Sequence, residues 1–225
     1  MTDQIVPRRS FLARLAAASA AIGAAFGSAA ALPAIVHAES APPPADEMDA
    51  WYAGMKGVNK VIYDCTAIAG APDGVMFARN LIKFSAEKLG TRDADNSVVV
   101  CFRHFATPFG YNDAMWSKYP AFISMLSIND PKTKKLATRN FLLHDEVEGE
   151  AGANLPGIRA HGVQFAICGA ATAFFAKQLA GAKGDAKKIE AELGANLILG
   201  AKMAPAGVVA VQRAQKAGFA YTFAG

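Results

Sequence analysis

Cys168 stands where two different residue patterns meet. Before it, the apolar residues Val163, Phe165 and Ile167 alternate with less apolar ones, which is typical of a buried strand. Residues 170–179 then follow a helical pattern. A thiol at a helix N-terminus lies near unpaired N–H groups and the positive end of the helix dipole, which favour a thiolate. The sequence therefore predicts a nucleophilic Cys168; the alternative is a small buried hydrophobic residue that closes the strand.

Two basic side chains, Arg103 and His104, follow the most apolar run of the chain, residues 98–102. At the end of a strand they could bind an anion such as sulfite or thiosulfate, or tune the thiol of Cys168. Because adjacent residues of a strand point to opposite faces, we expect only one of them to reach the crevice. The alternative is a histidine bonded to local backbone and an arginine in an intersubunit salt bridge.

The other two cysteines also lie in predicted strands, Cys65 at the end of residues 60–65 and Cys101 inside residues 98–102. Cys65 could contribute to the site as a resolving partner that forms a disulfide with Cys168, if their Cα atoms come within about 7 Å. The alternative for Cys65 is a role in the core or at the strand end. We expect Cys101 to be a packing residue.

Strands that alternate with helices predict an α/β fold, with a mostly parallel sheet and helices on both faces. The carboxyl ends of its strands should bring Asp64, Cys65, Arg103, His104 and Cys168 to one edge, where such sheets bind ligands. The predicted strands are 60–65, 98–102, 163–168, 208–211 and 219–223, and the predicted helices are 74–89, 170–179, 185–199 and a short one ending at Lys216.

Local signals place the ends of one helix and suggest a crevice mouth. Asp73 is expected to cap the N-terminus of helix 74–89, and Gly90 to end it. Four polar and aromatic residues after the second strand could line the mouth of the crevice, or could instead form a packed loop. They are Asn112, Asp113, Trp116 and Tyr119.

The first 38 residues resemble a twin-arginine signal peptide: Arg8 and Arg9 precede an apolar stretch that ends in small residues. Glycine, serine and proline interrupt this stretch, so we expect cleavage after Ala38 and no stable membrane insertion afterwards. Residues 39–47 form a proline-rich linker, and residues 48–225 are predicted to form one domain. The expected location is the periplasm.

The composition of the mature chain argues against several function classes. Removing the signal takes away three arginines and one aspartate, which leaves 20 basic and 18 acidic side chains. With no Lys/Arg cluster among aromatic residues, we expect no nucleic-acid partner. Because zinc-type Cys/His spacings, a P-loop, a dinucleotide fingerprint and a G-x-S-x-G motif are absent from the sequence, we expect no metal, cofactor or serine-hydrolase chemistry.

Three segments resemble the DsrE/DsrF-like family, the second of them its exported twin-arginine branch. These are GVQFAICGAA, VVVCFRHFATPFGYNDAMWSKY and PAGVVAVQRAQKAGFAYTF. The resemblance implies an α/β sandwich of about five strands that often forms trimers or hexamers. It also implies that a cysteine, here mapped onto Cys168, carries sulfur as a persulfide between partner proteins. This chain departs from the family by an insertion between Tyr119 and Leu155.

Two hypotheses about function follow. In the first, a periplasmic DsrE-like protein binds or transfers sulfane sulfur through Cys168, with a sulfur-donor or acceptor protein as partner. In the second, a non-catalytic oligomeric module holds a small anion or cofactor at the sheet edge, and its cysteines are structural. The sequence does not decide whether the protein is an enzyme.

Overall fold

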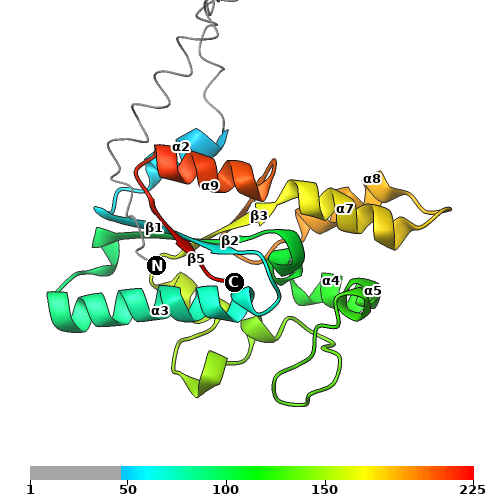
Figure 1. Cartoon of the computed structure of the whole chain (residues 1–225), viewed down its shortest axis with the longest axis horizontal. Helices are drawn as coiled ribbons and strands as arrows, with labels where there is room; N and C mark the ends of the chain where they lie inside the picture. Colours follow the sequence, from blue (N-terminus) through cyan, green and yellow to red (C-terminus); the bar gives the residue numbers. More distant parts are fainter. Residues whose placement is uncertain (1–46) are drawn as a thin grey trace, which may run out of the picture. The chain divides into compact units, whose positions relative to one another are not determined.

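Five parallel strands form one sheet in the order β4-β3-β2-β1-β5 (Figure 1). The computed structural model describes residues 47–225; the predicted signal peptide, and the linker except for Glu47, lie outside the described residues. The predicted α/β class with a parallel sheet is confirmed. The strands are β1 (Asn59–Cys65), β2 (Asn96–Phe102), β3 (Gln164–Cys168), β4 (Ala201–Ala204) and β5 (Ala220–Phe223).

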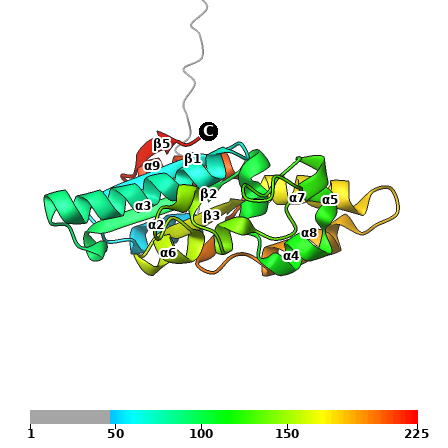
Figure 2. The ribbon, with the colours of Figure 1, turned by 90° about the horizontal axis from the view of Figure 1, so that it is seen from below.

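Helices cover both faces of the sheet. Helices α2 (Glu47–Gly54) and α9 (Gly207–Lys216) lie on one face, and α3 (Gly70–Leu89) lies on the other (Figures 1 and 2). Within residues 47–225, no helix combines the length and apolar content needed to cross a membrane. The remaining α-helices are α4 (Asp113–Lys118), α5 (Pro120–Met125), α6 (Leu155–Ala160), α7 (Gly169–Ala180) and α8 (Ala186–Ala195), and the short 3-10 helices are η1 (Asp93–Asp95), η2 (His104–Gly110), η3 (Phe141–Leu143) and η4 (Val147–Gly149).

The pleat of the sheet divides the buried side chains between two cores. Strand β2 is buried on both faces, which explains its unbroken apolar run. Its residues Val98, Val100 and Phe102 belong to the core on the α3 face, whereas Val99 and Cys101 belong to the core on the α9 face. The same alternation sets which side chains can meet at the carboxyl edge.

Helix α3 begins four residues earlier than its apolar pattern predicts. Its N-cap is Ala69, without a side-chain cap bond, and Asp73 lies inside the first turn, so the predicted capping role of Asp73 is wrong. Gly70, the first residue of the helix, lies so close to the C-terminal segment that a Cβ on it would come within 2.2 Å of the Ala224 carbonyl oxygen. The predicted stop is correct: Gly90 adopts φ +68° and donates its N–H to Ala86.

The segment predicted as strand 208–211 is instead the first turn of α9. Its β-branched valines favour a strand locally, but tertiary packing selects a helix. The small residues Gly207, Ala210 and Ala214 are buried at helical spacing, which lets α9 lie close to the sheet. The fourth strand along the chain is β4, a short edge strand that the sequence analysis missed.

The group expected at the crevice mouth belongs mainly to the loop packing between β2 and β3. Trp116 is almost fully buried in the core, and its indole Nε1 donates to the Pro108 carbonyl at 2.9 Å. Asn112 caps α4 by accepting from the Met115 N–H. The hydroxyl of Tyr119 donates to Glu192 on α8. The packed-loop alternative is therefore the correct one for these residues.

Burial of Tyr63 on β1 gives the fold a defined alkaline weakness. Desolvation raises the pKa of Tyr63 from 10.0 to about 12, because the folded state favours the neutral phenol. The contribution of the neutral Tyr63 phenol to the free energy of unfolding is complete below pH 10 and is lost as the pH rises to about 12. Between pH 10 and 12, the free energy of unfolding measured in urea should fall in the parent protein. In Tyr63→Phe, which has no phenol to ionise at this position, we expect this fall to be smaller by roughly 2 kcal/mol. Identical losses would contradict this cause.

Candidate functional site

The sulfur of Cys168 lies at the first turns of two helices. Cys168 ends β3 and is the N-cap of α7, where its Sγ accepts a hydrogen bond from the Ala171 N–H at 3.3 Å. The Gly207 N–H, at the first residue of α9, donates to the same Sγ at 3.1 Å. The predicted strand-to-helix junction is thus confirmed, and the start of α9, which the sequence analysis predicted as a strand, also meets it. Both donors favour negative charge on the sulfur.

Polar contacts behind Cys168 hold this junction in place. The hydroxyl of Thr172 donates to the Cys168 carbonyl at 2.9 Å and accepts from the buried Tyr111 hydroxyl at 2.8 Å. On the other side, the Ala170 N–H donates to the Pro205 carbonyl at 3.0 Å. The chain around Cys168 is therefore anchored to both the β2–β3 connection and the loop before α9.

Two glycines allow the close approach of the backbone segments around the sulfur. A Cβ on Gly169 would come within 2.7 Å of the Ala204 carbonyl oxygen, and a Cβ on Gly207 within 2.3 Å of the Arg103 Cβ. Any side chain at position 207 would push the α9 N-terminus away from β2 and from Cys168. The hydrogen bond from Gly207 to the sulfur thus depends on the absence of a side chain there.

Cys168 opens into a pocket of about 430 Å³ at the carboxyl edge of the sheet. Cys168 as a whole residue is only 6% exposed, so it is recessed in the wall of this pocket. The lining comes from η2 and the residue before it, from the start of α7 and from the start of α9. The lining residues are Arg103, His104, Phe105, Cys168, Ala170, Ala171, Phe174, Phe175, Ala206, Gly207 and Val208.

Arg103 lines the pocket but is engaged by a buried carboxylate. Its Nε and one terminal nitrogen donate to the two oxygens of Asp64 at 2.6 and 2.8 Å. Asp64 is 1% exposed and also accepts from the Tyr221 hydroxyl at 3.0 Å. These hydrogen bonds raise the pKa of Arg103, which remains cationic. The bidentate pair leaves Arg103 little capacity for a free anion.

His104 lines the same pocket, so the expectation that only one of the two basic residues would reach the crevice is wrong. The alternation of side chains applies within a strand, and β2 ends at Phe102. His104 then adopts φ +54°, a left-handed conformation that turns the chain into η2. Its exposed ring lies 3.9 Å, centroid to centroid, from that of Phe105.

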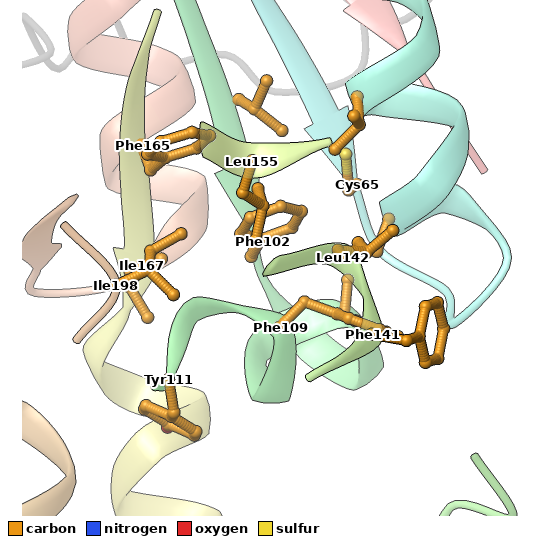
Figure 3. Packing of buried hydrophobic residues seen from close by; sticks show 14 of the residues in the cluster. Cys65, Phe102, Phe109, Tyr111, Phe141, Leu142, Leu155, Phe165, Ile167 and Ile198 are labelled. Atoms are coloured by element: carbon orange, nitrogen blue, oxygen red, sulfur yellow. The ribbon is translucent and has the colours of Figure 1, made fainter. Parts of the chain in front are cut away.

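Cys65 does not belong to this pocket. It is fully buried in the core on the α3 face, among the apolar side chains drawn in Figure 3. Cys168 follows the alternation of β3 to the α9 face, and β2 lies between the two strands. All three cysteines are free thiols. The structure thus places Cys65 in its alternative role, as a core residue, and does not bring it to Cys168 as a resolving partner.

Burial makes the other two thiols poor nucleophiles. It raises the pKa of Cys65 and of Cys101 well above the ordinary range for cysteine, with nearby negative charge adding to the effect. Cys101 is also fully buried, and its Sγ lies 3.9 Å from the Gly207 carbonyl oxygen. Among the three thiols, Cys168 alone lines a described pocket.

A larger hollow of about 640 Å³ lies against the start of α3 and has no comparable chemistry. Its lining includes Asp73, Lys132, Asp145, Glu146 and Glu148, but neither cysteine nor histidine. Across residues 47–225, no cluster of three or more His, Cys, Asp or Glu side chains is arranged to hold a metal ion. The Cys168 pocket is therefore the candidate site.

The sequence analysis did not identify Tyr221 or Gly207 as parts of the site. It placed Asp64 at this edge but did not pair it with Arg103, although an acid inside a buried strand requires a partner and Arg103 follows the neighbouring strand. Gly207 had a weak signal, since it opens the buried spacing of small residues in α9. Tyr221 lies on the edge strand β5, and nothing in its local sequence pointed to Asp64.

Comparisons of the chain with protein-family models, with curated proteins and with solved structures find no match. The site must therefore be interpreted from its own geometry.

Proposed function

We propose that this chain is an exported DsrE-like protein in which Cys168 accepts sulfane sulfur and passes it on. The observation that carries the proposal is the recessed Sγ in an open pocket, held by N–H groups from the first turns of α7 and α9. Two aligned donors stabilise an anionic sulfur, which is the nucleophilic form. They also leave the pocket side of the sulfur available for a second sulfur atom.

The proposed transfer has two half-reactions, each without net oxidation. In the first, the Cys168 thiolate attacks the outer sulfur of a donor persulfide, a new Sγ–S bond forms, and the donor S–S bond breaks with its electron pair leaving on the donor thiolate. In the second, an acceptor thiolate attacks the outer sulfur, and Cys168 leaves as a thiolate. The N–H groups of Ala171 and Gly207 stabilise the charge on Sγ before the first step and after the second.

The alternative function, anion binding by a non-catalytic module, has less support at this site. The guanidinium of Arg103 is paired with Asp64, and the other pocket walls are mostly apolar. We further propose that the protein acts in the periplasm as a homo-oligomer after twin-arginine export and exchanges sulfur with a donor or acceptor protein. The signal-like pattern of residues 1–38 and the family resemblance support these parts of the proposal.

Exposure to inorganic polysulfide should add one sulfur atom to Cys168. The experiment treats the reduced, folded protein, digests it and weighs the three cysteine peptides by mass spectrometry. We expect the Cys168 peptide to gain the sulfur, because Cys168 lines the pocket while Cys65 and Cys101 are fully buried. A Cys168 left unmodified both by polysulfide and by organic persulfides would remove the proposed function.

Two serine variants control for the position of the sulfur. Cys168→Ser should abolish loading, whereas Cys101→Ser, one residue short of the end of β2, should leave it intact. Equal loading of all three cysteines would indicate modification of unfolded protein, and the result would then count against a dedicated site.

A further inference from the structure

We infer that the sulfur donor of Cys168 is a small organic persulfide with an apolar body, and not an inorganic sulfur anion. The inference rests on the proposed function and names the class of substrate for the same pocket. It comes from the walls of the pocket, from the charges that face it and from the depth of the sulfur.

The walls are made of apolar side chains from three separate elements. Phe105 on η2, Phe174 on α7 and Val208 on α9 are 42, 48 and 61% exposed around the pocket. Phe175 and the small side chains of Ala170 and Ala171 complete the apolar lining. A volume of about 430 Å³ lies in the range of pockets that bury a small organic molecule.

The charges around the pocket do not suit a free inorganic anion. Arg103 and His104 are the basic residues of the lining, and no lysine, aspartate or glutamate belongs to it. Both oxygens of Asp64 already accept from the Arg103 guanidinium. An anion that entered would lose hydration without a free bidentate partner, whereas an apolar group would gain from leaving water.

The depth of the sulfur favours a small donor. Cys168 is 6% exposed, below the more exposed rim of Phe105, Phe174 and Val208. The apolar body of a small persulfide can rest against this rim while its terminal sulfur reaches Sγ. In the reaction RS–SH + Cys168–S⁻ → Cys168–S–SH + RS⁻, one S–S bond forms and one breaks, the proton stays on the transferred sulfur, and the donor leaves as a thiolate.

The test compares three donors: benzyl persulfide, cysteine persulfide and inorganic polysulfide. Rates of Cys168 loading are measured by mass spectrometry, and each is divided by the rate of the same donor with N-acetylcysteine to remove intrinsic reactivity. We expect the normalised rate for benzyl persulfide to exceed the other two by about tenfold, as burial of an aromatic ring in an apolar pocket predicts.

Matched variants locate the preference. Phe174→Glu should remove most of the advantage of benzyl persulfide, and Val208→Glu on a different helix should act in the same direction. Phe84→Glu is the control, because Phe84 on α3 is 47% exposed, as Phe174 is at 48%, but lies outside the pocket. It should leave the ratio of rates unchanged.

The outcomes separate the inference from the proposed function. Equal normalised rates, or a preference for inorganic polysulfide, would overturn the apolar-donor inference while the sulfur-transfer function stands. An unchanged preference in both pocket variants would overturn it as well. Failure of every donor to load Cys168 would overturn the proposed function itself.

Discussion

Arg103→Ala should lower the free energy of unfolding by about 3 kcal/mol at neutral pH. The variant leaves the Asp64 carboxylate, which is 1% exposed, with the Tyr221 hydroxyl as its remaining side-chain hydrogen-bond donor. A buried charge without its ionic partner costs far more than the net value of the pair, because desolvation is no longer compensated. Urea unfolding monitored by tryptophan fluorescence measures the loss.

A surface ion pair provides the matched control for Arg103. Arg92 pairs with Asp95 at 2.8 Å, but the Arg92 side chain is 80% exposed. Arg92→Ala should therefore lower the free energy of unfolding far less than Arg103→Ala does. The double variant Asp64→Asn, Arg103→Leu should recover part of the stability lost in Arg103→Ala, because it removes the unpaired charge. A loss as small for Arg103→Ala as for Arg92→Ala would contradict the buried-pair interpretation.

Trp116→Ala should cost about 4 kcal/mol, because it deletes a large buried side chain and leaves a cavity. The indole packs against the rings of Phe109, Phe122 and Phe141, and its N–H bonds to Pro108. The measurement is again urea unfolding. Persulfide loading per folded molecule should not change, because Trp116 does not line the Cys168 pocket.

The control for Trp116 is an exposed aromatic residue. Phe84→Ala on α3 should change stability by no more than about 0.5 kcal/mol. If Trp116→Ala were nearly as mild, the residue would not be the core element described above. A specific loss of loading without loss of stability would instead restore the crevice role that the sequence analysis considered for Trp116.

The sheet could be predicted well where a strand is buried on both faces. The apolar run of β2 has no helical period, and the alternation before Cys168 ends at the observed strand end. Strand β2 leads directly into Arg103 and β3 ends at Cys168, so the junction at Cys168 was predictable from the sequence. The first turn of α9 was not, because Val208, Val209 and Val211 favour a strand locally and packing against the sheet decides otherwise.

The faces of the sheet were harder to predict than its edge. Cys65 and Cys168 both end strands, yet their side chains belong to opposite faces of the sheet. The face of each side chain depends on which residue of β2 lies beside it: Cys65 pairs with Phe102, whereas β3 is aligned so that Ile167, and not Cys168, pairs with Phe102. The Asp64–Arg103 pair depends on the same register, as Asp64 lies opposite Cys101 and Arg103 follows two residues later. That these residues meet at the carboxyl edge of the sheet follows from the order of parallel strands. Which of their side chains touch can be predicted only when the register between neighbouring strands is known.

The hydrogen bond from Gly207 to Cys168 has a spectroscopic consequence. One amide proton at the start of α9 points at the sulfur that would gain a second sulfur atom in the proposed transfer. In a nitrogen–proton correlation spectrum, glycine amides occupy a region of their own, so the Gly207 resonance can report whether the sulfur is free or capped. The fold thereby supplies an internal label at the proposed sulfur-carrying atom, without any added probe.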